Sequence, residues 1–404
     1  MLSWKTSRRV LLCVTGGIAA YKIPELVSRL RSRSCEVEIV LTKAAEAMVS
    51  PLVLGTLSGR RVWLQDDFFS SERGFEIPHI CLAEWAEVVI LAPCTANTAA
   101  DLASGRGESL VSAIFLATRA PVLLFPAMNE HMYEHPATCQ NLRLLEQRGV
   151  RIVEPEYGSL ACGCEGKGRL PETSLILEEI AWALSPKRNL KGRRVLVTAG
   201  PTHEYLDPVR FLSNPSSGKM GLAMARTAWY RGAEVRLILG PVNTPGVLHG
   251  MEISFVVSAL EMYEQVLDNL PWADCVVKAA AVGDYRAKAR AEHKLKREKE
   301  ETLSLSLAQN PDIAAEVGAR KREDQLLIGF AAETNDLREN ARSKMERKKL
   351  DAIIANDVLA PGCGFGSDTN EVRLIFRDGE ASFSGSKEEV ADAIWGSLTS
   401  RKML

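Results

Sequence analysis

The sequence predicts an α/β protein with two doubly wound, mostly parallel-sheet Rossmann-like domains in series. Each half begins with a basic pair, an apolar strand and a glycine turn, at residues 8–17 (RRVLLCVTGG) and 193–201 (RRVLVTAGP). In both halves, short apolar runs alternate with helical stretches. A strand that enters a glycine turn and then a helix is typical of phosphate-binding α/β folds.

The first half contains near-continuous runs of Val, Ile and Leu, which predict strands covered on both faces, as in a parallel sheet. The predicted strands are residues 10–14, 36–41, 88–91, 122–125 and 151–153. Predicted helices lie between them at residues 19–33, 96–104, 109–117 and 136–148.

A polar linker at residues 185–189 separates the halves and predicts domains of residues 1–188 and 189–404. The alternation then resumes at residues 195–199, 220–231, 234–239, 259–270, 274–280, 325–331 and 351–355. A late pair, residues 371–376 and 381–384, predicts a hairpin around Asp378 and Gly379. Eleven of the sixteen residues 286–301 are Lys, Arg or Glu, which predicts a mobile loop or a solvated helix.

The composition is that of a soluble globular enzyme, with 404 residues, 46% hydrophobic and 25% charged. A formal net charge of -1 argues against a general nucleic-acid or membrane surface. No transmembrane helix or secretion signal is expected. Nine scattered cysteines, some within apolar strands, indicate a reducing cytoplasm.

Two strand ends in the first half offer candidate phosphate sites. Residues 15–22 (TGGIAAYK) lack the GxGxxG spacing, so they indicate either a site for one phosphate or a tight turn. Thr95, Asn97 and Thr98 present short polar groups beside a helix start. They suit a phosphate or a ribityl chain, and ordinary capping by Thr95 is the alternative.

Histidines and cysteines provide further candidates. His79 precedes a strand and is either structural or catalytic. His131 and His135 have the spacing of a metal pair, but Pro136 follows at once and no third ligand is near. Cys162 and Cys164 lie in a glycine-rich loop without the second pair that zinc requires, which leaves an acid, a redox group or an incidental thiol.

Together these features resemble the flavin-dependent cysteine decarboxylases over nearly all of residues 8–184. The resemblance rests on the histidine-bearing loop before the third strand, the Asn97-Thr98 segment, residues 126–133 (PAMNEHMY) and the flap at 161–169 (ACGCEGKGR). It implies a flavodoxin-like domain that binds FMN. The implied FMN-binding residues are Gly16, Gly17, Ile18, Thr42, Thr95 and Asn97.

This resemblance also implies the reaction, in which phosphopantothenoylcysteine yields phosphopantetheine and CO2. The flavin oxidises the thiol towards a thioaldehyde, CO2 leaves from the position beta to this electron sink, and the reduced flavin returns the electrons. His79 is then the base, Asn129 positions the carboxylate and Cys162 donates a proton. Cys164 stands where the family often has Asp, so the choice of flap acid between the two thiols stays open.

Strand ends in the second half carry a second set of polar motifs. Residues 213–221 (SNPSSGKMG) present Ser216, Ser217 and Lys219 at a helix start, as a phosphate cradle or as an ordinary cap. Residues 279–285, 294–297 and 329–335 follow, two of them at strand ends, where parallel sheets bind ligands. In this context the charged stretch at 286–301 is alternatively a lid over a triphosphate.

The motif order resembles the phosphopantothenate–cysteine ligases over residues 191–400. It implies that CTP activates the phosphopantothenate carboxylate as an acyl-cytidylate, pyrophosphate leaves and the cysteine amine attacks. Arg210 and Asn214 then hold phosphopantothenate or the acyl intermediate, and Ala280 lies at that pocket. The implied substrate and CTP contacts are Asp284, Lys294, Asn310, Pro311, Asp312, Ile313, Phe330, Lys344 and Lys348. Mg2+ is expected on the phosphates, with ligands that the sequence does not assign.

The whole chain therefore resembles the fused enzymes of bacterial coenzyme A biosynthesis. The resemblance implies a homo-oligomer with trimeric flavin-domain and dimeric ligase-domain contacts. One rival is a regulatory flavoprotein subunit with a degenerate ligase domain, and the presence of His79, Asn129 and Cys162 argues against it. Another is an NAD(P) oxidoreductase, which the missing GxGxxG motif disfavours.

Overall fold

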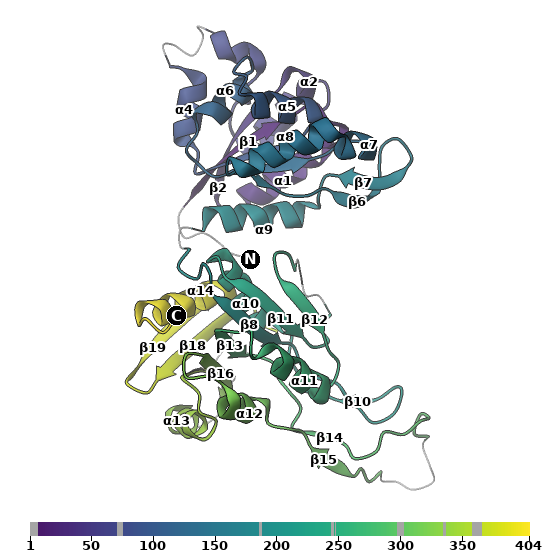
Figure 1. Ribbon diagram of the computed structural model, residues 1–404, viewed down its shortest axis with the longest axis vertical. Coiled ribbons are helices and arrows are strands. Elements are labelled where there is room, and N and C mark those ends of the chain that lie inside the picture. Colours follow the sequence, from purple (N-terminus) through teal and green to yellow (C-terminus); the bar gives the residue numbers. More distant parts are fainter. Residues whose placement is uncertain are drawn as a thin grey trace. The chain divides into compact units, whose positions relative to one another are not determined.

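The computed structural model describes residues 7–70, 76–185, 188–243, 246, 248–296, 303–333, 337–357 and 366–404. The chain divides into two compact units, one that ends at Leu184 and one that starts at Ser185 (Figure 1). Within the described ranges, no helix is long and apolar enough to span a membrane.

The first unit is built on a five-stranded parallel sheet in the order β2-β1-β3-β4-β5. Its strands are β1 (Arg8–Val14), β2 (Cys35–Leu41), β3 (Val88–Cys94), β4 (Val122–Pro126) and β5 (Arg151–Ile152). Every residue of β3 is buried, as expected for a strand covered on both faces.

Helices cover both faces of this sheet. Leucines and valines of α1 (Ile23–Arg31), α3 (Pro51–Ser58) and α9 (Thr173–Leu184) pack on one face. On the other lie α4 (Pro78–Trp85), α5 (Ala96–Ser104), α6 (Leu110–Ala117) and α8 (Pro136–Gln147). Strand order reverses between β1 and β3, and such a switch point leaves a ligand-binding crevice at the carboxyl ends of the strands.

The predicted helix over residues 19–33 is wrong in its first turn. The structure has a 3-10 helix, η1 (Ile18–Lys22), and α1 begins only at Ile23. Pro24 lies in the first turn of α1. Because proline has no N–H for an i to i−4 bond, it starts a helix but does not continue one.

The second unit has an eight-stranded sheet in the order β12-β11-β8-β13-β16-β17-β18-β19. The strands are β8 (Arg194–Ala199), β11 (Glu234–Leu239), β12 (Glu252–Phe255), β13 (Cys275–Lys278), β16 (Leu326–Glu333), β17 (Ala352–Asp357), β18 (Thr369–Phe376) and β19 (Gly379–Ser386). All neighbours are parallel except the pairs β17–β18 and β18–β19. The predicted hairpin around Asp378 and Gly379 is confirmed.

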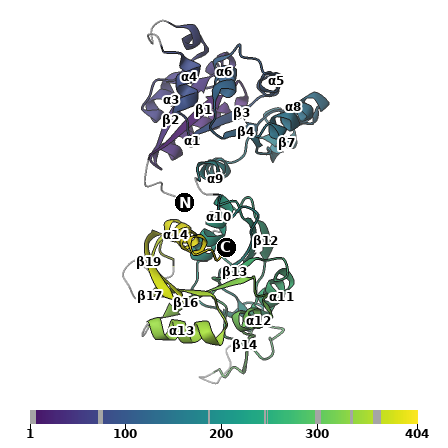
Figure 2. The same ribbon diagram turned by 60° about the vertical axis from the view of Figure 1, so that its left-hand side comes forward.

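Helices also flank the second sheet. Two of them, α10 (Lys219–Tyr230) and α14 (Lys387–Ser400), pack together on one face, whereas α11 (Ala259–Asn269), α12 (Ile313–Arg320) and α13 (Leu337–Arg347) cover the other (Figures 1 and 2). These two units confirm the predicted α/β class with mostly parallel sheets.

The charged stretch is not a helix where it is described. Residues Tyr285–Ala287 form β14, which pairs antiparallel with β15 (Leu307–Gln309). Residues 288–296 are irregular, and residues 297–301 lie outside the described part of the chain. A second short pair, β9 (Glu204–Tyr205) and β10 (Phe211–Leu212), lies in the loop after β8.

Candidate active sites

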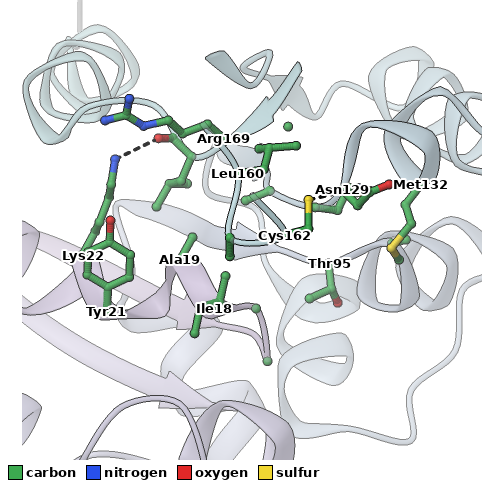
Figure 3. Close-up of a pocket in the computed structure, with 18 of the residues that line it drawn as sticks. Ile18, Ala19, Tyr21, Lys22, Thr95, Asn129, Met132, Leu160, Cys162 and Arg169 are labelled. Atoms are coloured by element: carbon green, nitrogen blue, oxygen red, sulfur yellow. Dashed lines mark hydrogen bonds between the residues drawn. The ribbon is translucent and has the colours of Figure 1, made fainter. Parts of the chain in front are cut away.

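A cavity of about 610 Å³ lies at the carboxyl ends of β1 and β3 in the first unit. Figure 3 shows its side chains, which come from the turn after β1, the start of α5, the turn after β4 and the hairpin of β6 (Glu156–Ser159) and β7 (Glu165–Arg169). The lining includes Gly16, Gly17, Ile18, Tyr21, Lys22, Thr95, Met128, Asn129, Met132, Leu160, Cys162, Arg169 and Leu170. The cavity therefore brings together six of the predicted site residues of this domain: Gly16, Gly17, Ile18, Thr95, Asn129 and Cys162.

The glycine turn after β1 is packed too closely for a larger residue. A Cβ atom at Gly16 would lie 2.3 Å from the Cβ of Ala44. The Thr15 hydroxyl donates to the Pro93 carbonyl (2.8 Å) and accepts from the Thr95 backbone N–H (3.0 Å), which ties the ends of β1 and β3 together. The cavity wall thus combines turn backbone with the N-terminus of α5, the arrangement that suits one phosphate group.

The β6–β7 hairpin lies directly on the turn after β4, and glycine makes this contact possible. A Cβ atom at Gly168 would lie 2.0 Å from the Met128 carbonyl oxygen, and one at Gly166 would lie 2.6 Å from the Glu130 carboxylate. Two hydrogen bonds hold the contact: Met128 N–H donates to the Gly168 carbonyl (3.0 Å), and Lys167 N–H donates to Glu130 (2.9 Å). The base of the flap is therefore fixed over the cavity.

Cys162 and Asn129 meet above this cavity (Figure 3). The Asn129 amide oxygen accepts from the His131 N–H (3.0 Å), which directs the NH2 group towards the Cys162 sulfur, 3.6 Å away. The backbone hydrogen bond from Cys164 lowers the pKa of the exposed Cys162 thiol; desolvation opposes this effect, and the Asn129 amide makes a smaller contribution that also lowers the pKa. Cys164 is exposed and does not line the cavity.

Three predicted residues of the first domain do not line this cavity. Thr42 caps the short helix α2 (Lys43–Glu46) by accepting from Ala45 N–H, and the Asn97 amide donates to Asp101 (3.0 Å). His79 lies in the first turn of α4 and not in a loop as predicted, because the chain enters the helix at Pro78.

The His79 ring stands edge-on to Phe68, with ring centroids 5.4 Å apart. Its Nδ1 atom is buried and has no hydrogen-bond partner among the described residues. Within the described residues, no group of three His, Cys, Asp or Glu side chains is placed to hold a metal ion.

A second cavity of about 230 Å³ lies at the carboxyl end of β13, beside β16. Its walls are the loop after β13, the start of α12, the middle of β16 and one face of α13 with the turn that follows it. Nine predicted residues line it together: Ala280, Asp284, Asn310, Pro311, Asp312, Ile313, Phe330, Lys344 and Lys348.

Polar contacts order these walls. Asp312 caps α12 through Ala315 N–H (3.1 Å) and pairs with Lys348 (2.8 Å). Desolvation alone would raise the pKa of the Asp312 carboxyl, but these two contacts hold it below its usual value. The buried Asn310 amide donates to the Gly283 carbonyl (2.8 Å) and so holds the loop after β13 against the segment that precedes α12.

Lys278 also lines this cavity, and the sequence interpretation missed it. It is the last residue of β13 and only 8% exposed. Burial lowers the pKa of its amine to about 7, the nearby Asp312 and Lys348 acting in opposite directions. The available signal was a single lysine at the end of an otherwise apolar strand.

Three predicted ligase residues lie outside the second cavity: Arg210, Asn214 and Lys294, all exposed. The fully buried Asp207 carboxylate accepts from Arg210 N–H (2.8 Å) and Leu295 N–H (3.0 Å), which joins the loops that carry Arg210 and Lys294. The Asn214 amide donates to the Val282 carbonyl (3.0 Å), beside the loop after β13.

At the predicted phosphate cradle, the start of α10, the Lys219 side chain is bound to other groups of the protein. Lys219 pairs with Asp368 (2.6 Å) and donates to the Gly366 carbonyl (2.8 Å). Gly218 has φ of +71°, a conformation that favours glycine, and caps the helix without a side-chain bond.

Comparisons with known proteins match both units. A flavoprotein family matches residues 2–185, and the C-terminal domain family of DNA/pantothenate metabolism flavoproteins matches residues 190–401. Among solved structures, the C-terminal domain of a coenzyme A biosynthesis bifunctional protein CoaBC is 37% identical, covers 54% of this chain and 98% of its own, and has a TM-score of 0.45. The FMN-binding protein AtHal3 is 34% identical, covers 43% and 94%, and has a TM-score of 0.39.

Curated relatives extend over nearly the whole chain. The coenzyme A biosynthesis bifunctional protein CoaBC of Bacillus subtilis is 45% identical over 92% of this chain and 91% of its own length. Its counterpart in Escherichia coli K12 is 44% identical over 95% and 94%. Because these relatives align through both units, the chain belongs to the family of bifunctional coenzyme A biosynthesis enzymes, which combine a decarboxylase with a ligase.

Proposed function

We propose that the second domain, residues 189–404, joins 4'-phosphopantothenate to cysteine at the expense of CTP. The first domain, residues 1–188, then decarboxylates the resulting phosphopantothenoylcysteine to 4'-phosphopantetheine. The observation that carries this proposal is the meeting of Asn129 and Cys162 over the glycine-turn cavity, in a chain whose relatives span both domains.

The residues of the first cavity fit FMN. The turn at Gly16 and Gly17 and the start of α5 offer backbone N–H groups for one phosphate, and no pyrophosphate fingerprint is present. Ile18, Met128 and Leu170 offer apolar surface for a flat ring system. When bound there, FMN supplies the two-electron chemistry that makes the carbon beside the substrate's carboxylate able to release CO2.

Side chains of the first domain then have distinct roles. The Asn129 amide holds the substrate carboxylate. Its oxygen accepts from His131 N–H, which directs its NH2 group towards Cys162. Cys162 donates a proton to the enethiolate that remains after CO2 leaves, because it lies over the cavity and its pKa is lowered. Cys164, which does not line the cavity, is not needed for this step.

His79 is proposed as the base, and it acts in a neighbouring copy because it does not line the cavity of its own domain. Two exposed apolar side chains lie near it: Ile77, two residues before it, is 55% exposed, and Phe69, which packs on its neighbour Phe68, is 87% exposed. Exposed apolar groups of this size favour a protein contact. We therefore propose a trimer of flavin domains, in which a neighbour delivers the histidine, and a dimer of ligase domains.

The second cavity is proposed as the CTP pocket. Lys344 and Lys348 contact the nucleotide, and Phe330 lines the cavity beside them. Lys294, on the loop joined to Asp207, acts on the triphosphate, and Mg2+ offsets further phosphate charge. Arg210 and Asn214, which lie outside this cavity, hold phosphopantothenate and then the acyl-cytidylate.

The absorption spectrum of the purified protein, with mass spectrometry of the released cofactor, tests the flavin assignment. We expect a visible flavin band and FMN. FAD, or no flavin after reconstitution, would remove the basis for the decarboxylase. A regulatory subunit would bind FMN but show no turnover of phosphopantothenoylcysteine, so the same preparation separates that alternative. Together with this role in coenzyme A biosynthesis, we propose that the protein is located in the cytoplasm.

A further inference from the structure

Lys278 occupies an unusual position at the inner wall of the second cavity. Its neighbours across the sheet are Thr198 on β8 and Gly329 on β16. Leu350 fills the space beside Gly329, because a Cβ atom there would lie 2.6 Å from the Leu350 Cδ1, and all three residues line the cavity. The Lys278 amine is buried and has no hydrogen-bond partner among the described residues.

None of the charged groups described around Lys278 forms an ion pair with its amine. Asp312, at the start of α12, is already bound by Lys348 and by Ala315 N–H. From α13 and the turn after it, Lys344 and Lys348 add positive charge to the same cavity, and Asp284 in the loop after β13 is exposed. Desolvation lowers the pKa of Lys278 to about 7, although Asp312 opposes this effect, and Lys348 lowers the pKa further.

A buried amine without a partner destabilises the empty protein, because it loses water and gains no hydrogen bond. Such a group in a cavity is a candidate for ligand contact. The space around it is narrow and partly apolar, with Ala280, Ile313 and Leu350 in the lining. A flat heterocycle suits this space better than a hydrated triphosphate, and the 2-oxo group and N3 of a cytosine ring are hydrogen-bond acceptors.

We propose that Lys278 is a ligand-contacting residue of the nucleotide pocket, whose amine donates to the acceptor edge of the cytosine ring and takes up a proton from solvent as CTP binds. The inference rests on the proposed assignment of CTP to this cavity. Beyond that assignment, it identifies a contact that the sequence motifs did not indicate. It also makes nucleotide binding depend on pH.

The direction of this dependence follows from the free protein. Above a pH of about 7 the amine of empty Lys278 is mostly neutral. A hydrogen bond to an acceptor favours the charged form and raises its pKa in the complex. Binding at pH 8 is therefore accompanied by the uptake of a proton, approaching one per chain, whereas at pH 6 the amine is already charged and little uptake is expected.

Isothermal titration calorimetry of the full chain with CTP and Mg2+, in two buffers of different ionisation enthalpy, measures this uptake. We expect Lys278→Met to abolish the uptake at pH 8, to weaken CTP binding tenfold or more and to raise the melting temperature of the free protein. Lys321→Met is the matched control, because Lys321 is nearly as buried but pairs with Asp351 (3.0 Å) outside the cavity. It should leave affinity and uptake unchanged and lower the melting temperature.

Two further ligands identify the part of CTP that Lys278 contacts. If the base is the partner, Lys278→Met weakens binding of CMP and CTP alike and leaves inorganic triphosphate unaffected. Weaker binding of triphosphate alone would overturn the base contact in favour of a phosphate oxygen.

The remaining outcomes separate the inference from the function on which it rests. Equal CTP affinity and equal uptake in the wild type and Lys278→Met would reject the role of Lys278 and leave the CTP pocket standing. No CTP binding by the wild type would reject the proposed pocket itself. Should the variant fail to fold, the wild type decides, because an uptake that does not rise between pH 6 and pH 8 contradicts the inference.

Discussion

At the residue scale, the two thiols of the flap have different surroundings although they are only two positions apart. Cys162 lines the cavity and approaches Asn129, while Cys164 supplies the backbone contact that lowers the pKa of Cys162. We predict that Cys162→Ser reduces phosphopantetheine formation at least ~100-fold, since a hydroxyl is a far weaker acid than a thiol. An enethiol derived from the substrate should accumulate and be detected by mass spectrometry.

Cys164→Ser is the control for that experiment. It keeps the backbone N–H that contacts Cys162, so turnover should stay close to that of the wild type. The opposite pattern, with normal turnover in Cys162→Ser and loss in Cys164→Ser, would assign the flap acid to Cys164.

Lys278 predicts how stability depends on pH. Its pKa is about 7 in the folded chain and near 10.4 when unfolded, so between these values the unfolded chain binds more protons. The contribution of this residue to the free energy of unfolding therefore rises with pH from about 7 to about 10.4 and is least favourable below 7. Denaturant unfolding of the wild type and Lys278→Met across this range measures it. A stability difference between the two that does not change with pH would contradict the prediction.

Motifs identified most of the cavity residues, and the exceptions have physical causes. Asn129 and Cys162 are 33 residues apart in the sequence, yet both belong to short polar motifs that stand out from the apolar strands. Lys278 gave no such signal, because a lysine after an apolar run is usually a solvated strand end. Thr42 and Asn97 were placed at the site by resemblance, but their side chains are engaged in local helix contacts.

At the element scale, the β6–β7 hairpin depends on the absence of a side chain at Gly168. A Cβ atom there would collide with the Met128 carbonyl at 2.0 Å, so the hairpin must lift from the turn after β4. We predict that Gly168→Ala lowers decarboxylation ~10-fold or more, because displacing a reacting group by an ångström is costly. CTP-dependent ligation should be unaffected.

Gly158→Ala is the matched control on the neighbouring strand. A Cβ atom at Gly158 would meet only the Arg169 side chain, at 3.4 Å, and that chain is long and adaptable. Decarboxylation assays of the two variants test the argument, which fails if both lose activity equally.

The charged stretch after β14 is tethered in part by Asp207, which accepts from the N–H of Leu295 next to Lys294. We predict that Lys294→Gln slows cytidylate formation by roughly 100-fold, since a lysine over a departing pyrophosphate stabilises developing charge. Lys288→Gln, in the same loop, should change the rate little. Pyrophosphate release reports both rates, and equal mild effects would favour a merely solvated loop.

Secondary structure was predictable where apolar runs were clear. Apart from the edge strand β12, which the sequence interpretation missed, the strands of both sheets and the hairpin of β18 and β19 follow from such runs and from the turn at Asp378 and Gly379. Helix α9 was missed because Glu178 and Glu179 are buried at core positions, Glu179 against Arg151, which breaks the apolar period. Helix α4 is apolar on nearly every side and therefore shows no helical period at all.

At the scale of the whole molecule, the chain combines two units with separate sheets and separate cavities. Sequence alternation predicted two α/β domains, because each has its own opening strand and glycine turn. The assembly of copies was not predictable in the same way, since it depends on complementary surfaces that no local pattern encodes. The exposed apolar residues near His79 are one feature of the first unit that favours such contacts.

One reaction mixture tests the central claim that this chain performs both steps. Purified protein reconstituted with FMN is incubated with 4'-phosphopantothenate, cysteine, CTP and Mg2+, and the products are identified by mass spectrometry. We predict 4'-phosphopantetheine, CO2, CMP and pyrophosphate in equal amounts. Accumulation of phosphopantothenoylcysteine without CO2, or no CTP-dependent product at all, would contradict the account.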